Sequence, residues 1–161
     1  MLTTPWFKLL KNLDFHVVDY HSDQVIVLPI VAGQSILLPK VHRKILGQSV
    51  WELPAGEVAK FESSEMGALR ELKEETGVKI LDADRLTPEH SIVVSPNRLP
   101  MFPNIYSINI SADEYRSRLP HDREVESVGC FSFETIQSMI KSGEIFTTIT
   151  LAIIGRFLAN R

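Results

Sequence analysis

Two glutamates near the middle of the chain have the type and spacing to bind a metal ion. Glu71 and Glu75 are four residues apart, so on a helix their carboxylates project from one face, with the Cβ atoms about 6 Å apart. Glu74 lies one position round the helix from Glu75. Like charges crowded in this way destabilise a helix, and a hard divalent cation with oxygen ligands is the usual compensation. The cluster therefore predicts a site for Mg2+, with Mn2+ as the alternative.

The residues around this pair follow a longer pattern. It consists of a glycine, five residues, a glutamate, seven residues and then Arg-Glu-apolar-x-Glu-Glu-x-Gly-apolar, and every fixed position from Gly56 to Val78 is filled. This spacing resembles the Nudix box. A purely structural interpretation is a solvated helix face crossed by ion pairs, of which Arg70 with Glu74 would be one. That interpretation accounts for neither Gly56 nor Glu62 at their distances from the helix.

The resemblance implies a role for each residue of the box. Glu71 and Glu75 correspond to direct metal ligands, and the backbone carbonyl of Ala55 completes the set. Glu74 either ligates the metal or holds Arg70, and the sequence leaves both roles open. The remaining fixed residues are expected to support the site: Glu62 by bracing the loop, Gly56 by permitting a backbone conformation or a close approach that a side chain would block, and Gly77 by ending the helix.

Segments outside the box resemble the Nudix branch that hydrolyses ADP-ribose and related nucleoside diphosphate sugars. The similar segments are 27–30, 37–38 with Arg43, 51–56, 143–145 and 148–150. The branch implies a metal-dependent pyrophosphohydrolase that releases a nucleoside monophosphate and a sugar phosphate. One departure concerns the sugar. The branch commonly continues after its box with Ser-Pro-Gly and acidic residues, whereas here Ser95-Pro96 leads into Asn97-Arg98.

A second acidic segment, 121–126, holds the candidates for the base that activates the attacking water. By its place in the chain, Glu124 corresponds to another metal-binding glutamate that the branch supplies from a mobile loop, and Asp122 corresponds to the catalytic base. His121 is a rival base, since its unperturbed pKa lies near neutrality. The polar composition of 111–122 predicts a surface loop. A solvated charged loop with no catalytic role is the alternative interpretation.

Two arginines are candidates to bind the phosphate or ribose oxygens of a small-molecule nucleotide. Arg43 precedes the box and Arg98 follows it, and a guanidinium pairs well with phosphate oxygens. Either arginine can also be a simple surface cation.

Three functions remain open from the sequence. The first is hydrolysis of ADP-ribose or a related nucleoside diphosphate sugar. The second keeps the reaction but changes the substrate to a dinucleotide polyphosphate or a damaged nucleoside triphosphate. The third is a non-catalytic module that senses a nucleotide. The complete set of Glu71, Glu74 and Glu75 argues against a sensor, because binding without cleavage does not require all three carboxylates.

The order of the predicted elements indicates an α/β fold. Strands are expected at 12–20, 25–31, 35–38, 51–53, 91–94, 105–110 and 125–131, and helices at 63–76, 134–141 and 147–160. Strands with interposed helices favour a mixed sheet that has helices on both sides. This is also the Nudix-type α/β/α sandwich that the resemblance implies.

Length and composition fit a single domain over residues 1–161. The chain is 44% hydrophobic and 23% charged, so it can bury a core without metals or disulfides to hold it. The single cysteine, Cys130, excludes an internal disulfide and suggests a reducing compartment. No segment has the length and apolar character of a membrane span. We therefore expect a cytoplasmic protein that does not associate with membranes.

The net charge and the amino-terminal segment indicate which binding partners to expect. The net charge of −3 gives no reason to expect binding to nucleic acid. In enzymes of the ADP-ribose-hydrolysing branch that this chain resembles, the amino-terminal region takes part in a homodimer. Residues 1–24 are therefore expected to form an amino-terminal extension that contacts a second copy of the chain.

Overall fold

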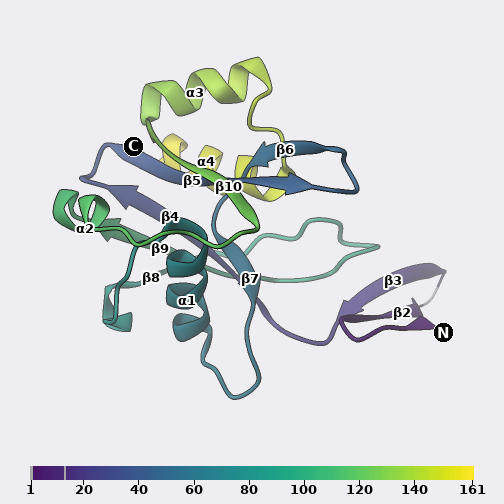
Figure 1. Ribbon diagram of the computed structural model, residues 1–161. Coiled ribbons are helices and arrows are strands. Elements are labelled where there is room, and N and C mark those ends of the chain that lie inside the picture. Colours follow the sequence, from purple (N-terminus) through teal and green to yellow (C-terminus); the bar gives the residue numbers. More distant parts are fainter. Residues whose placement is uncertain (1, 13) are drawn as a thin grey trace.

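The structure is a computed structural model that describes residues 2–12 and 14–161. Its centre is a seven-stranded sheet in the order β10-β5-β4-β9-β8, with β6 paired to β5 and β7 paired to β4 (Figure 1). The strands are β4 (Gln24–Val31), β5 (Ser35–Arg43), β6 (Gln48–Trp51), β7 (Ala55–Glu57), β8 (Thr87–Glu89), β9 (Asn104–Ile110) and β10 (Val125–Ser132). β4 and β9 are parallel, and the other pairs are antiparallel. The predicted mixed sheet is confirmed.

Helices cover both faces of this sheet (Figure 1). They are α1 (Ser64–Thr76), α2 (Ala112–Arg116), α3 (Phe133–Ser142) and α4 (Thr148–Ala159), with a short 3-10 helix at Ala83–Arg85. Alternate residues of β4 belong to two separate hydrophobic cores. Val25 and Val27 pack with Leu72 of α1 on one face, whereas Ile26 and Leu28 pack with residues of α3 and α4 on the other. The predicted α/β/α sandwich is therefore confirmed, and it explains why β4 is apolar at nearly every position.

Helix α1 has the boundaries that its sequence predicts. The Ser63 side chain accepts a hydrogen bond from the Met66 N–H at 3.3 Å, which caps the amino-terminal end. Gly77 adopts a left-handed conformation with φ of 77°, and its N–H donates to the Lys73 carbonyl. Leu69 and Leu72 are buried on the face toward the sheet. This leaves the glutamates on a different face of the helix.

The amino-terminal residues form a separate three-stranded antiparallel sheet. It contains β1 (Leu2–Thr3), β2 (Phe7–Asn12) and β3 (Phe15–Tyr20) in the order β1-β2-β3, and it projects from the central sheet (Figure 1). The strand predicted at 12–20 corresponds to β3, but β2 was not predicted, and residue 13 lies outside the described part of the chain. Trp6 remains 61% exposed. The extension thus leaves apolar surface in contact with solvent.

The strand predicted at 91–94 was wrong. These residues form no strand, although they are rich in β-branched side chains. One edge of β9 pairs with β4, and the other edge pairs with β8. Because both edges of β9 are occupied, 91–94 cannot add to the sheet there, and Ser91 Oγ donates instead to the Pro103 carbonyl at 2.7 Å.

The structure also differs from the predicted elements at 111–122 and at 51–53. The loop predicted at 111–122 contains α2, because Ser111 and Glu114 form a capping box at its start. The strand predicted at 51–53 ends at Trp51, where β6 stops pairing with β5, and Leu53 packs in a core instead. Among the described residues, no helix has the length and apolar character needed to cross a membrane.

The end of α1 is joined to the chain that leads into β10. The Leu119 N–H donates to the Gly77 carbonyl at 2.8 Å, and the Asp122 N–H donates to the Glu74 carbonyl at 2.8 Å. A Cβ atom on Gly77 would lie 1.9 Å from the Leu119 carbonyl oxygen. Gly143, which ends α3 with φ of 82°, has nothing within 4 Å of such an atom.

These two glycines make a matched pair of variants. Gly143→Ala should lower the free energy of unfolding by about 1 kcal/mol, the cost of a left-handed alanine. Gly77→Ala should cost clearly more, because the backbone at Leu119 must also move. Chemical denaturation of both purified variants measures the difference. Equal losses would show that the close approach of Leu119 contributes nothing to stability.

Candidate active site

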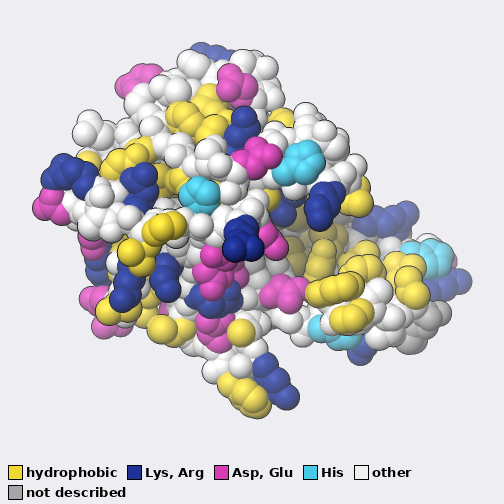
Figure 2. All heavy atoms as spheres, in the orientation of Figure 1, with side chains coloured by type: hydrophobic (Ala, Val, Ile, Leu, Met, Phe, Trp, Pro, Cys, Tyr) yellow, Lys and Arg dark blue, Asp and Glu magenta, His cyan; other side chains and the backbone are white. Residues whose placement is uncertain are grey.

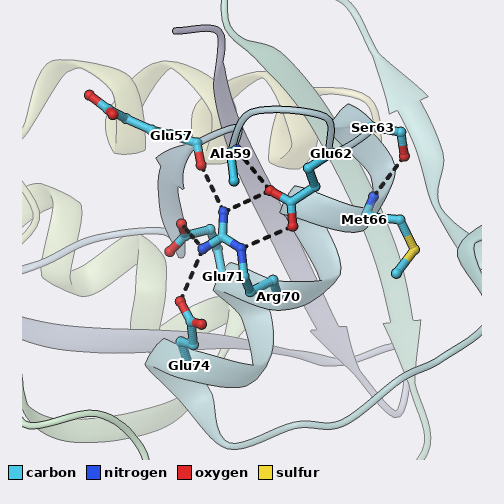
Figure 3. Close-up of polar contacts among 8 residues, drawn as sticks. All are labelled: Glu57, Ala59, Glu62, Ser63, Met66, Arg70, Glu71 and Glu74. Carbon is cyan, nitrogen blue, oxygen red and sulfur yellow. Dashed lines mark hydrogen bonds and ion pairs between the residues drawn. The ribbon is translucent and has the colours of Figure 1, made fainter. Parts of the chain in front are cut away.

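Arg70 is the centre of the polar network on α1 (Figure 3). Its Nε and Nη2 atoms each donate to a Glu62 carboxylate oxygen at 3.0 Å. Its Nη1 donates to Glu71 Oε1 at 2.5 Å and to Glu74 Oε2 at 3.1 Å, and its Nη2 donates to the Glu57 carbonyl at 2.7 Å. The bonds to Glu62 raise the pKa of Arg70 above its ordinary value and lower the pKa of Glu62. One permanent cation thus holds three carboxylates together.

The ion pair expected between Arg70 and Glu74 is present in this network. Glu62 also accepts a hydrogen bond from the Ala59 N–H at 2.9 Å. It therefore connects the loop between β7 and α1 to the helix, which is the contact that a loop-bracing residue makes. Figure 2 shows acidic and basic side chains side by side over α1.

Gly56 is needed at its position because Glu71 lies against it. A Cβ atom there would lie 2.1 Å from Glu71 Oε1. Gly56 does not have a positive φ, so its role is the close approach of a side chain and not an unusual backbone conformation. The missing side chain lets the Glu71 carboxylate pack against β7.

Glu71 and Glu75 are partly buried acids beside Ala55 and Gly56. The Glu71 side chain is only 12% exposed, and burial raises the pKa of its carboxyl group. Burial, followed by the nearby Glu71 carboxylate, raises the pKa of Glu75 to about 8. The Ala55 N–H donates to Glu75 Oε2 at 3.4 Å. The structure thus brings together Ala55, Glu71 and Glu75, three of the four residues that the sequence predicted as metal ligands; Glu124 is the fourth.

The donor set at this place fits a divalent metal ion. The Glu71 carboxylate is close enough to disfavour the ionisation of Glu75, and both partly buried carboxylates present oxygen atoms, which Mg2+ and Mn2+ prefer. Among the described residues no three acidic, histidine or cysteine side chains converge on one point. The candidate set is therefore two carboxylates with a backbone carbonyl, and Arg70 already pairs with Glu71. A bound divalent cation would supply charge neutralisation to a diphosphate there.

Arg43 and Glu52 form an ion pair at the edge of the site. Arg43 Nε donates to Glu52 Oε2 at 2.9 Å, and Nη2 bonds the same oxygen. Both residues line two cavities, one of about 940 Å³ and one of about 290 Å³. The smaller cavity also includes Ala55. Glu52 was not singled out from the sequence, although a charged residue between Trp51 and Leu53, two apolar neighbours, is a signal that could have identified it.

The acidic segment 121–126 lies beside this pair. Glu124 lines the larger cavity together with Arg43 and Glu52. Asp122 is attached to the end of α1 through its backbone N–H. His121 lines a different cavity on the side of Thr76. The larger cavity thus contains both Glu124 and Arg43.

Arg98 is not beside Arg43. Its guanidinium lies over the ring of Phe15, 5.2 Å from the centroid, and its carbonyl accepts from the Val18 N–H at 2.8 Å. It therefore joins the long segment before β9 to the amino-terminal sheet. Its assignment to substrate binding stays a prediction.

Comparison with known proteins identifies the family. A family model described as NUDIX domain matches residues 20–147, which is most of the chain. The chain belongs to the Nudix family. This confirms the resemblance inferred from the box, and the enzyme is a Nudix pyrophosphohydrolase.

Two curated relatives are similar over most of this Nudix chain. One is the ADP-ribose pyrophosphatase of Bacillus subtilis (strain 168), 30% identical over 131 residues, which are 81% of this chain and 69% of that protein. The other is the methanol dehydrogenase activator of Bacillus methanolicus, 30% identical over 132 residues, which are 81% of this chain and 69% of that protein. The first relative supports a likeness to the ADP-ribose pyrophosphatase branch.

Variants that lack the Glu71 or the Glu75 carboxylate test metal binding separately from folding. Glu75→Gln and Glu71→Gln should each lower kcat by at least about 100-fold, since each removes a metal-binding charge. Without divalent cations Glu75→Gln should melt no lower than wild type, because it replaces a partly buried acid, whose ionisation the site disfavours, with a neutral isostere. Mg2+ should raise the Tm of wild type and leave that of Glu75→Gln nearly unchanged.

The exposed Glu144→Gln serves as the control and should behave as wild type in both measurements. Thermal melts with and without Mg2+, together with turnover assays, test the assignment. Near-normal turnover in Glu71→Gln or Glu75→Gln would overturn this metal site.

Proposed function

We propose that the enzyme is a Mg2+-dependent pyrophosphohydrolase, with Mn2+ as an alternative metal, that cleaves ADP-ribose or a related nucleoside diphosphate sugar. The products are a nucleoside monophosphate and a sugar phosphate. The observation that carries the proposal is the position of Arg43, which lines two cavities of unequal size and is close enough to the partly buried Glu75 to lower its pKa against the effect of burial.

The chemistry of a diphosphate explains why this arrangement supports hydrolysis. A diphosphate carries at least two negative charges in neutral water, so it repels an attacking nucleophile. Arg43 offers a permanent positive charge to the phosphate oxygens. Glu71, Glu75 and the Ala55 carbonyl offer oxygen ligands to a metal that neutralises further charge. The two cavities that Arg43 lines leave room for a substituent on each phosphate.

A second candidate function follows from the other relative. Its name describes that protein as an activator of another enzyme, and it is as similar to this chain as the pyrophosphatase is. The alternative to cleavage of a nucleoside diphosphate sugar is a hydrolase that acts on another nucleotide, or a module that senses one without cleaving it. Intact Glu71, Glu74 and Glu75 favour catalysis over sensing.

A hydrolysis screen tests the proposal. ADP-ribose, other nucleoside diphosphate sugars, dinucleotide polyphosphates and nucleoside triphosphates are each incubated with enzyme and Mg2+ or Mn2+. We expect the highest kcat/KM for a nucleoside diphosphate sugar, with the two monophosphates as products. A preference for a triphosphate or a dinucleotide would contradict the proposed substrate class. Absence of turnover with every compound would favour the sensing module.

The segment 121–126 is proposed to supply the base. Asp122 is assigned as the base and Glu124 as a further metal ligand, supported by the position of Glu124 in the larger cavity beside Arg43. Asp122→Ala and Glu124→Ala should lower kcat more than they raise KM, because the loss falls on the transition state.

Glu126→Ala is the matched control, since Glu126 lines the same cavity and should matter less. Profiles of kcat against pH for these variants and His121→Ala decide between the bases. Loss confined to His121→Ala would show that histidine is the base.

The same proposal includes a homodimer, in which residues 1–24 contact the second copy. Exposed Trp6, Leu2 and Tyr20 on the projecting sheet support this contact. Light scattering on the active enzyme should give twice the chain mass. A monomer with full specific activity would contradict the dimer.

A further inference from the structure

Part of the lining of the smaller cavity beside Ala55 comes from residues to which the proposed catalytic mechanism gives no role. This cavity has a volume of about 290 Å³, and its lining includes Arg43, Glu52 and Ala55, the residues Thr147–Thr150, and the apolar side chains of Ile26, Leu53 and Val94. These threonines form the start of α4. The cavity thus joins the candidate catalytic residues to a hydroxyl-rich helix end that is distant in sequence.

Thr147 differs from the other residues that precede helices in this protein. It occupies the N-cap position of α4, but its side chain makes no capping hydrogen bond. Its Oγ1 atom is buried and has no hydrogen-bond partner among the described residues. The N-cap serines of α1, α2 and α3 each accept an N–H of the first turn. A buried hydroxyl without a partner is destabilising, so its presence beside a cavity points to a partner outside the chain.

The other polar groups of the cavity can bond the same partner. Thr150 is only 2% exposed and lines the cavity. The Glu52 side chain, 18% exposed, contributes a carboxylate. The first-turn N–H groups of a helix have no acceptor within the helix, so they can donate to an oxygen atom of a bound ligand. The cavity therefore combines hydrogen-bond donors with an acceptor, and sugar hydroxyls do both.

We propose that this cavity binds the sugar half of the substrate, with Thr147, Thr150 and Glu52 as hydrogen-bonding partners of its hydroxyl groups. The inference rests on the proposed function. Arg43 then meets the diphosphate at the boundary of the two cavities, and the nucleoside occupies the larger one. The difference in volume, about 290 Å³ against about 940 Å³, agrees with a sugar on one side and a larger nucleoside on the other.

Separate binding of the two products tests which half the cavity takes. Isothermal titration measures the Kd of ribose 5-phosphate and of AMP for wild type, Thr147→Val and Thr150→Val. Valine keeps the branched shape and removes the hydroxyl group. We expect each variant to weaken ribose 5-phosphate by about fivefold, the loss of one hydrogen bond, and to leave AMP unchanged. Thr147→Val should also melt at or above the wild-type temperature, because it removes an unsatisfied buried group.

Ser132→Ala is the matched control at another helix start. Ser132 accepts a hydrogen bond from the Thr135 N–H at 3.2 Å, so its loss should lower the melting temperature and leave both Kd values unchanged. This contrast distinguishes a ligand-binding threonine from an ordinary cap.

Several outcomes would overturn the inference. They are unchanged ribose 5-phosphate binding in both valine variants, loss of AMP binding instead, no detectable ribose 5-phosphate binding by wild type, or equal binding of inorganic phosphate and ribose 5-phosphate. Hydrolysis of ADP-ribose is assayed on the same wild-type preparation. Hydrolysis without the expected binding changes would reject the sugar cavity alone, whereas no hydrolysis of any nucleoside diphosphate sugar would reject the proposed function.

Discussion

The guanidinium of Arg70 is the interaction on which the arrangement of the site depends. Glu62, Glu71 and Glu74 would repel one another if they were brought together without a cation. Arg70 bonds all three and also the Glu57 carbonyl. These bonds connect β7, the following loop and α1. The acidic side chains are consequently held in place by the protein itself, before any metal is considered.

Glu75 is the acid of the site that has no bond to Arg70 among the described contacts. Glu75 lies beside Ala55 and Glu71, and its pKa is raised to about 8 by burial and by that neighbouring carboxylate. Such a group destabilises the fold when it is ionised without a partner. The carboxylates around Arg70 are therefore paired with a permanent cation of the protein. Glu75 is not, and a bound divalent cation would supply the missing positive charge. Strongly perturbed carboxyl groups are common where a protein does chemistry.

A second ion pair organises the space around the acids. Arg43 and Glu52 line both the larger and the smaller cavity, so a ligand in either one meets the same guanidinium. The smaller cavity reaches Ala55 and the start of α4, and the larger one reaches Glu124. The lining includes residues of β4, β5, the segment between β6 and β7, the segment before β10 and α4. The proposed division of the substrate into two halves follows from this geometry.

The sequence alone determined the features that depend on residues close together in the chain. The spacing of Glu71 and Glu75, the Ser63 cap and the Gly77 stop are set by the period and the ends of one helix, so the metal site and the family were predicted from them. The capping box of α2 is equally local and could have been found. Only the tertiary structure decided that 91–94 is not a strand, that Glu52 holds Arg43 and that Thr147 borders the smaller cavity. These outcomes depend on which sheet edges are free and on which distant segments meet, and residue type does not encode either one locally.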